Sequence, residues 1–518
     1  MIRYLLLLLP IVVCACRPAP EAPPRPNIVF AIADDATFRH FGAYGCTWVK
    51  TPNFDRVARE GVLFARAYTP NAKCAPSRAC ILTGRQSWLL EEAANHSPRF
   101  PAKFKTFAEA LADTGYFVGH TAKAWAPGDP GEADGRRRQL IGPKFSEHQT
   151  EPPADHMSRN DYAANFGAFL DARTDGRPFF FWYGGTEPHR PYAFGAGVRH
   201  GKRLDAVDGI PPFWPDNDTV RTDLLDYAFE IEYFDHHLGR MLDTLAARGE
   251  LDNTLVVVTA DNGMPFPRVK GQTYELNHHL PLAMMWPAGV ASPGRTVDDF
   301  VNFIDFAPTF LALAGTSPDA AALQPVQGVS LVPYLQDADS LPARDHVLIG
   351  KERHDVGRPH DQGYPARGIV TDEFLYVRNY APDRWPAGNP ETGYLGTDGG
   401  ATKTWILDHR TDPANDHYWR LNFGKKPEEE LYRIADDPAC VDNLALDPEM
   451  QAIKARLRQR MEAQLLAEGD PRMRGEGHVF DEYPYYGEVR GFYERYTAGD
   501  TIETSWVNES DFEFAPPD

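Results

Sequence analysis

Apolar runs that stop abruptly at polar residues recur along the chain. The run over residues 27–34, NIVFAIAD, is continuously apolar up to its final carboxylate, which predicts a strand buried on both faces. Similar runs predict further strands over residues 116–120, 177–186 and 251–261. Helical spacing of apolar residues predicts intervening helices over residues 107–115, 224–248 and 306–315. This alternation favours an α/β domain whose mostly parallel sheet is sandwiched by helices.

Polar side chains stand at the ends of these predicted strands. Asp34 and Asp35 end the first strand, and Asp261 and Asn262 end a later one. Because ligands gather beyond the carboxyl ends of parallel strands, we expect these four side chains to meet. Their oxygens suit a hard cation, Ca²⁺ or Mg²⁺. Taken alone, Asp34 and Asp35 are explained equally well as a helix cap and a surface charge.

Two lysines and two histidines also follow predicted strands. One interpretation is that Lys123 and Lys270 are ordinary surface lysines. The alternative is that both lie at the same end of the sheet and together bind an anion. His278 and His279 are adjacent, so their side chains tend to diverge. The sequence therefore offers no close His/Cys ligand pair of the kind that zinc requires.

The pattern changes after residue 345. Short strand-like pieces such as residues 368–379, separated by Pro, Gly and Asp turns, predict a smaller antiparallel subdomain over residues 346–518. The preceding α/β domain is predicted over residues 27–345. A surface helix is expected over residues 448–466, and the aromatic, acidic tail from Phe480 onward is expected to pack against the body of the protein.

The first residues have the pattern of an export signal. Arg3 precedes a short apolar run, which small residues follow up to Cys16. The segment Val13–Cys16 resembles a bacterial lipobox, which implies that residues 1–16 form a lipoprotein-type signal and that cleavage before Cys16 leaves this cysteine to carry the lipid. A Pro-rich linker, residues 17–26, follows. We expect export to the periplasm or cell surface, with membrane contact through the lipid anchor only; the alternative is secretion without lipid.

Composition narrows the classes of partner. The 518 residues carry 73 acidic and 53 basic side chains, a net charge of −20, which excludes a broad basic surface for nucleic acid. An anionic substrate therefore requires a local cluster of cations. Only four cysteines remain beyond the signal, too few for a disulfide framework, so Cys74 needs its own explanation.

The segment KCAPSRACILTGRQ, residues 73–86, carries a family resemblance. Its C-x-P-S-R motif, Cys74 to Arg78, and the following L-T-G-R resemble the signature of type I sulfatases of the alkaline-phosphatase-like superfamily. The resemblance implies that a maturation enzyme oxidises Cys74 to formylglycine (3-oxoalanine), whose hydrate is the nucleophile. A serine or an unmodified cysteine lacks the second hydroxyl through which the aldehyde re-forms and sulfate departs.

The resemblance extends over roughly residues 27–470 and assigns further roles. It implies a Ca²⁺ site, with Mg²⁺ as the alternative, formed by Asp34, Asp35, Asp261, Asn262 and the modified Cys74. It also implies that Arg78 holds the hydrate and that Lys123 and Lys270 grip the sulfate.

Two departures from the family pattern leave the general acid open. Trp125 stands where the family has the histidine of G-K-W-H, and Thr186 replaces the first histidine of H-x-P-H. His189, His279 and Glu187 are the candidate acids. A degenerate, inactive homologue is the alternative, against which the intact Cys74 motif and metal set speak.

The substrate is narrowed only to a sulfated glycan. Residues 187–190, 261–267 and 353–367 resemble the heparan N-sulfatase (N-sulfoglucosamine sulfohydrolase) branch. Bacterial relatives with these features also suggest an O-sulfatase for algal or host glycans. The expected substrate contacts are His279, His354, Arg358 and Arg367, each with a structural role as the alternative. A phosphodiesterase or phosphonate hydrolase of the same superfamily, and a non-catalytic glycan-binding protein, are the other two classes.

Overall fold

The computed structural model describes residues 25–338 and 343–513. The predicted signal peptide with Cys16, and the linker up to residue 24, lie outside the described residues. Among the helices that are described, none combines the length and the apolar character needed to cross a membrane.

The larger sheet has eight strands, and its order is β10-β2-β9-β7-β1-β6-β3, with β8 paired to β2. The central strand β1 runs parallel to both β6 and β7, and β9 runs antiparallel to β7 and β2. This confirms the predicted mostly parallel sheet. The strands are β1 Asn27–Ala33, β2 Val62–Tyr68, β3 Phe117–Ala122, β6 Phe179–Gly184, β7 Thr254–Ala260, β8 His279–Leu280, β9 Leu282–Met285 and β10 Arg295–Asn302.

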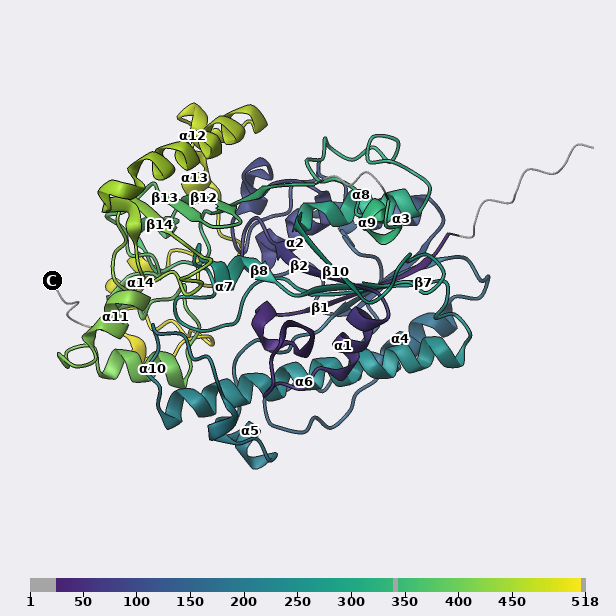
Figure 1. Ribbon diagram of the computed structural model, residues 1–518, viewed down its shortest axis with the longest axis horizontal. Coiled ribbons are helices and arrows are strands. Elements are labelled where there is room, and N and C mark those ends of the chain that lie inside the picture. Colours follow the sequence, from purple (N-terminus) through teal and green to yellow (C-terminus); the bar gives the residue numbers. More distant parts are fainter. Residues whose placement is uncertain (1–24, 339–342, 514–518) are drawn as a thin grey trace, which may run out of the picture.

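Helices cover both faces of this sheet (Figure 1). Alternate residues of β1 point to opposite faces, so Val29 and Ala31 belong to one apolar core while Ile28 and Phe30 belong to the other. The first core contains α1 Pro52–Arg59, α4 Tyr162–Ala172 and α6 Asp218–Ala247. The second contains α2 Cys74–Thr83, α3 Phe107–Asp113 and α8 Phe306–Leu313. Burial on both faces explains why β1 reads as a continuous apolar run.

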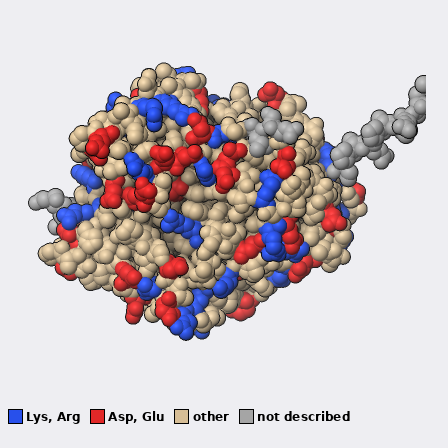
Figure 2. Space-filling view, viewed as in Figure 1, with Lys and Arg blue, Asp and Glu red and all other residues tan. Residues whose placement is uncertain are grey.

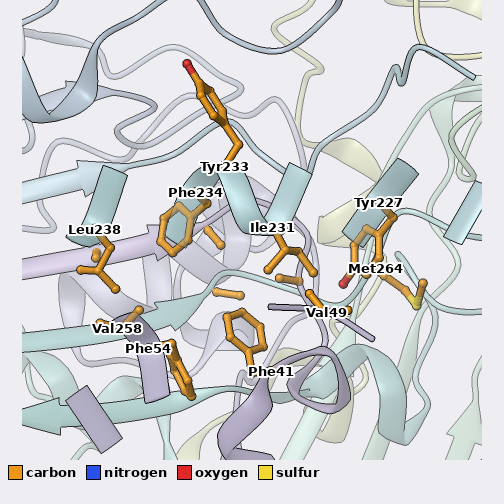
Figure 3. Close-up of a cluster of buried hydrophobic side chains, with 14 of the residues drawn as sticks. Phe41, Val49, Phe54, Tyr227, Ile231, Tyr233, Phe234, Leu238, Val258 and Met264 are labelled. Atoms are coloured by element: carbon orange, nitrogen blue, oxygen red, sulfur yellow. The ribbon is translucent and has the colours of Figure 1, made fainter. Parts of the chain in front are cut away.

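The helix α6 is the longest element and covers the first core. Figure 3 shows Ile231, Phe234 and Leu238 of α6 gathered with Val258 of β7 and Phe54 of α1. The helix begins at Asp218, six residues before the predicted start at residue 224, because the side chain of Asn217 caps it by accepting from the Val220 amide at 3.0 Å. The first turns are polar, so apolar spacing alone did not reveal them.

A second sheet of four antiparallel strands follows in the C-terminal part, in the order β11-β12-β13-β14. Residues 368–379, read as one strand-like piece, form a hairpin in which the Thr371 amide donates to the Phe374 carbonyl. The helix α12 packs on this sheet. The elements are β11 His346–Lys351, β12 Ala366–Thr371, β13 Leu375–Asn379, β14 Glu429–Tyr432 and α12 Gln451–Glu468.

The chain returns to the body after α12, as predicted for the tail. Tyr485, Phe492 and Val507 are buried against Val356 and Leu395. The remaining elements are short: β4 Glu132–Ala133, β5 Arg136–Arg137, α5 Ala196–Arg199, α7 Glu275–His278, α9 Val332–Leu335, α10 Ala401–Asp408, α11 Asp416–Asn422, α13 Val479–Glu482 and α14 Phe492–Thr497.

The packing of α6 on the sheet yields a stability prediction. Ile231 is fully buried between α6 and the sheet. We expect Ile231→Ala to lower the free energy of unfolding by about 2–5 kcal/mol, because it removes buried methyl groups and leaves a cavity. Asp243→Ala, an exposed position on the same helix, should change it by less than about 0.5 kcal/mol. Thermal unfolding of both variants checks this, and equal shifts would contradict the packing described.

Candidate active site

The carboxyl ends of four parallel strands converge on one set of polar side chains. Asp34 and Asp35 follow β1, Asp261 follows β7, and Lys123 follows β3. The His189 loop follows β6, whose pairing with β1 brings it to the same place. The three carboxylates are fully or almost fully buried. The structure therefore brings these strand-end residues together at one edge of the sheet.

Oxygen atoms are concentrated at this point. Asp34, Asp35 and Asp261 each offer a carboxylate oxygen, and these lie within 4.8 Å of one another. Asn262 donates from Nδ2 to Asp35 Oδ1 at 2.7 Å, while its buried Oδ1 has no hydrogen-bond partner among the described residues. An unsatisfied buried oxygen beside three carboxylates fits a cation ligand. The donor set suits a hard divalent cation and consists of four of the five ligands predicted from the sequence; the fifth, Cys74, forms a further candidate group with Asp34 and His189.

Three cations compensate the charge of these carboxylates. Arg78 Nε lies 2.8 Å from Asp261 Oδ2, and Lys270 Nζ lies 2.6 Å from Asp35 Oδ2. Lys123 forms an ion pair with Asp34. Burial opposes ionisation of Asp34, yet the charge of Lys123 lowers its pKa to about 2.

The two lysines stay charged in this environment. Burial disfavours the ammonium forms, but Asp34 raises the pKa of Lys123, and Asp35 with Asp398 raises that of Lys270 well above its usual value. Asp398 accepts from Lys270 Nζ at 2.6 Å. Both lysines are therefore protonated in this structure, and each is held by at least one carboxylate.

Cys74 is the first residue of α2 and is 2% exposed. Its Sγ lies 3.9 Å from Asp35 Oδ1, which places it at the acidic cluster. Burial raises the pKa of the thiol, so the side chain remains protonated and is a poor nucleophile as it stands. Arg78 lies one turn further along α2, and its contact with Asp261 fixes this helix against the end of β7.

A cavity of about 750 Å³ opens onto these residues. Among the predicted site residues, its lining contains Cys74, Lys123, His189 and Lys270. His189 Nε2 lies 3.1 Å from Lys270 Nζ, and its Nδ1 lies 2.7 Å from the Arg190 carbonyl oxygen. The carbonyl requires Nδ1 to be the N–H donor, which leaves Nε2 as the atom at the site.

The other two candidate acids do not line this cavity. Glu187 accepts from the Ser158 amide and the Tyr162 hydroxyl. His279 stacks on Phe38, and its two ring nitrogens lie 2.8 Å from Glu275 Oε1 and 2.7 Å from the carbonyl oxygen of Ala65, respectively. Both side chains are therefore committed to contacts within the protein.

The residues that replace the family histidines also have structural contacts. Trp125 donates from Nε1 to the Ala75 carbonyl at 3.0 Å, which packs its indole against α2. Thr186 Oγ1 lies 2.7 Å from the Tyr162 hydroxyl. Neither side chain offers a titrating group to replace the missing imidazole.

The prediction of four substrate contacts needs correction, because none of these residues lines the cavity: His279, His354, Arg358 and Arg367. Arg358 is buried and donates to the carbonyls of Trp385 and Pro386. Arg367 is paired at 2.7 Å with Asp470. His354 Nε2 lies 2.6 Å from Asn71 Oδ1, and His279 is placed as described above. These four side chains stabilise the packing between the two sheets and the loops around them.

Sequence reasoning missed several residues of the cavity wall. Asp398 lies in a Gly-rich turn without periodicity, and Trp506 lies in the tail. Lys73, which directly precedes Cys74 in the chain, forms an ion pair in which its Nζ lies 2.7 Å from Asp355 Oδ2. Of these residues, only Lys73 could have been suspected from the sequence, because it is a cation adjacent to the C-x-P-S-R motif.

Comparisons with known proteins agree with this architecture. The Sulfatase family matches residues 26–316, and the family described as N-sulphoglucosamine sulphohydrolase, C-terminal, matches residues 269–386. An ulvan-active sulfatase of Formosa agariphila is 26% identical over 87% of this chain and 76% of its own length. N-sulphoglucosamine sulphohydrolase of Homo sapiens is 26% identical over 88% of this chain and 91% of its own. The solved structure of BT4656 in complex with its substrate D-glucosamine-2-N,6-O-disulfate has a TM-score of 0.61 at 21% identity, covering 86% and 98% of the two chains.

The chain combines a mostly parallel sheet flanked by helices with an acidic cluster and two lysines at its carboxyl edge, and it shares its fold with the solved structure named above. The Sulfatase match spans more than half of the chain. The protein therefore belongs to the Sulfatase family and is a sulfuric ester hydrolase.

The acidic cluster yields a prediction about cations. We expect Ca²⁺ to raise the thermal unfolding temperature of chelator-treated protein, because a ligand that binds only the folded state stabilises it by about 2.7 kcal/mol at a hundred times its dissociation constant. Asp261→Asn should lose this increment, while the exposed Asp243→Asn should keep it.

The same titration with Mg²⁺ distinguishes the two hard cations. An increment that survives unchanged in Asp261→Asn, or the absence of any increment with either cation, would contradict a cation site at this cluster.

Proposed function

We propose that the protein hydrolyses sulfate ester or sulfamate groups of sulfated glycans, with a heparan N-sulfatase-like activity as the first candidate. The observation that carries the proposal is that Cys74, from an intact C-x-P-S-R motif, lines one cavity with Lys123 and Lys270, and that all three side chains contact the acidic cluster. The names of the relatives, an ulvan-active sulfatase and an N-sulphoglucosamine sulphohydrolase, support a glycan substrate.

Two groups acquired after synthesis belong to this proposal. A formylglycine-generating maturation enzyme converts Cys74 to formylglycine, which as its hydrate supplies a nucleophilic hydroxyl and a second hydroxyl that lets the aldehyde re-form. Asp34, Asp35, Asp261 and Asn262 would hold Ca²⁺, or Mg²⁺, which supplies positive charge that lowers the pKa of a neighbouring hydroxyl.

The remaining work falls to residues of the chain. Lys123 and Lys270 bind the sulfo oxygens and stabilise the charge that develops on them, since both stay protonated. Arg78, fixed by Asp261, orients the side chain at position 74 from the same helix. Asp398 positions Lys270 through a second ion pair at Nζ.

His189 is the general acid in this proposal. Its Nε2 is the ring atom at the site, and it lies beside Lys270, which grips the sulfo group. Because Nδ1 keeps its proton for the Arg190 carbonyl, Nε2 carries a proton only when the ring is the imidazolium; in that form it can donate to the leaving oxygen of an ester or the leaving nitrogen of a sulfamate.

The alternatives differ in what the site must hold. An O-sulfatase on algal or host glycans uses the same residues, so only substrates separate it from an N-sulfatase. A phosphodiesterase or phosphonate hydrolase of this superfamily usually holds two transition metals. In the part of the chain that the structure describes, the candidate ligand groups overlap in one cluster around Asp34, Asp35 and His189. The intact C-x-P-S-R motif at Cys74, where those hydrolases usually carry Thr or Ser, favours sulfatase chemistry.

Export and anchoring remain proposals from the sequence. The signal-like pattern of residues 1–16 supports export, and a lipid on Cys16 would tether the enzyme to a bacterial membrane. On the face shown in Figure 2, basic and acidic side chains are interspersed. This face carries no broad basic patch, in keeping with the net charge of −20.

Substitution at residue 74 tests the proposed function. Cys74→Ala removes the precursor of the nucleophile, so sulfate release from a panel of N- and O-sulfated oligosaccharides should fall by at least about a thousandfold. Cys80→Ala, a second buried cysteine on the same helix, should retain activity if it folds. Undiminished release by Cys74→Ala would refute the proposal, and the panel shows whether N- or O-sulfo groups are removed.

Replacement of His189 tests the general acid. His189→Ala should lower kcat by about 10²–10⁴-fold for substrates with poor leaving groups and much less for an activated aryl sulfate, whose leaving group needs no proton. His279→Gln provides the matched control, because that side chain does not line the cavity. Equal losses on both substrates, or a larger loss in His279→Gln than in His189→Ala, would exclude His189 from this role.

A further inference from the structure

The C-terminal segment, defined here as residues 485–507, forms part of the cavity wall. Tyr485, Ser505 and Trp506 line the same cavity as Cys74 and Lys270. The two family matches end at residues 316 and 386. This part of the cavity therefore comes from a region that lies beyond both family matches.

Both ends of the C-terminal segment are fixed to the rim of the cavity. At one end the Tyr486 amide donates to the Ser97 carbonyl at 2.8 Å, and Ser97 is itself a lining residue. At the other end the Gly399 amide donates to the Trp506 carbonyl at 2.6 Å. Between these anchors the segment is held by a buried apolar cluster of Val356, Leu395, Tyr485, Val489, Phe492 and Val507. The C-terminal segment is thus an ordered part of the cavity wall, fixed at both of its ends.

The orientation of Trp506 is fixed by its only polar atom. Indole Nε1 donates to the Leu395 carbonyl at 2.9 Å, so the ring has no hydrogen bond left to offer a ligand. The side chain is only partly buried, and its residue lines the cavity. What Trp506 presents to a bound molecule is therefore apolar aromatic surface.

The backbone of Trp506 is held next to the anion-binding end of the cavity. Gly399, which bonds the Trp506 backbone, follows Asp398, and Asp398 accepts from Lys270 Nζ at 2.6 Å. Polar side chains, Lys144, Gln149 and Arg159, line the cavity from the segment between β3 and α4. A molecule held by its anionic group at Lys270 thus has both an aromatic contact and polar contacts within reach.

We propose that Trp506 is a specificity-determining residue, the platform on which the sugar ring stacks while its sulfo group lies at Lys123 and Lys270. This inference rests on the proposed function and deepens it. A pyranose has apolar C–H faces and polar edges, which match one aromatic wall and one polar wall. The cavity is therefore selective for ring-shaped sulfated sugars over acyclic sulfate esters, and the C-terminal segment makes it so.

The test compares Trp506→Ala with Trp506→Phe and with Tyr496→Ala. Tyr496 lies in the same segment, packs on Phe492 and Phe512, and does not line the cavity, so it controls for loosening of the segment. For N-sulfated heparan and sulfated ulvan oligosaccharides, we expect Trp506→Ala to raise KM about tenfold with kcat within about twofold. Trp506→Phe should restore most of the affinity, and hydrolysis of an acyclic alkyl sulfate should be unaffected by all three changes.

A binding measurement keeps this inference separate from the proposed function. In the Cys74→Ala background, which cannot turn over substrate, calorimetry with the same oligosaccharides should show about tenfold weaker binding when Trp506 is also replaced by Ala. If wild-type protein released no sulfate while this difference persisted, the proposed function would fail and the platform would stand. Equal effects of Trp506→Ala and Tyr496→Ala, an unchanged KM, or no binding of either oligosaccharide would overturn the inference.

Discussion

The pairing of buried carboxylates with buried cations at the carboxyl edge of the large sheet is the interaction on which the site depends. Asp34, Asp35 and Asp261 lie close enough to repel one another, and taking such charges out of water is costly unless they are compensated. Arg78 comes from a helix and Lys270 from the loop after β7, so compensation is achieved only when distant segments have folded together. The formation of the fold and the formation of the site are therefore coupled.

The same pairing links cation binding to anion binding. The carboxylates that suit a hard cation are the partners of the two lysines in this structure. A cation at the acidic cluster would take over the compensation of Asp34 and Asp35, which leaves the ammonium groups of Lys123 and Lys270 available to sulfo oxygens. Electrostatic balance thus explains why metal ligands and anion-binding lysines occur at one edge of the sheet.

Much of this arrangement could be predicted from short segments of the sequence. A buried parallel strand has a continuous apolar sequence, and the residue after it lies at the carboxyl edge, so Asp34 and Asp261 were predicted to meet. The cavity wall was not predictable in this way. Trp506 lies in a stretch without regular secondary structure, and backbone hydrogen bonds to Ser97 and Gly399, which are distant in the sequence, hold the C-terminal segment at the cavity. Arg367 was misassigned because a buried arginine paired with Asp470 and a substrate-binding arginine look alike in a sequence.

The central claim is that the nucleophile derives from Cys74, whose buried thiol is protonated and unsuited to the reaction. The most direct measurement is mass spectrometry of the peptide that contains residue 74, taken from protein of known specific activity made with and without a formylglycine-generating enzyme. The account predicts that sulfate release is proportional to the fraction of peptide carrying an aldehyde or its hydrate in place of the thiol. Fully active protein with an unmodified thiol at Cys74 would contradict it.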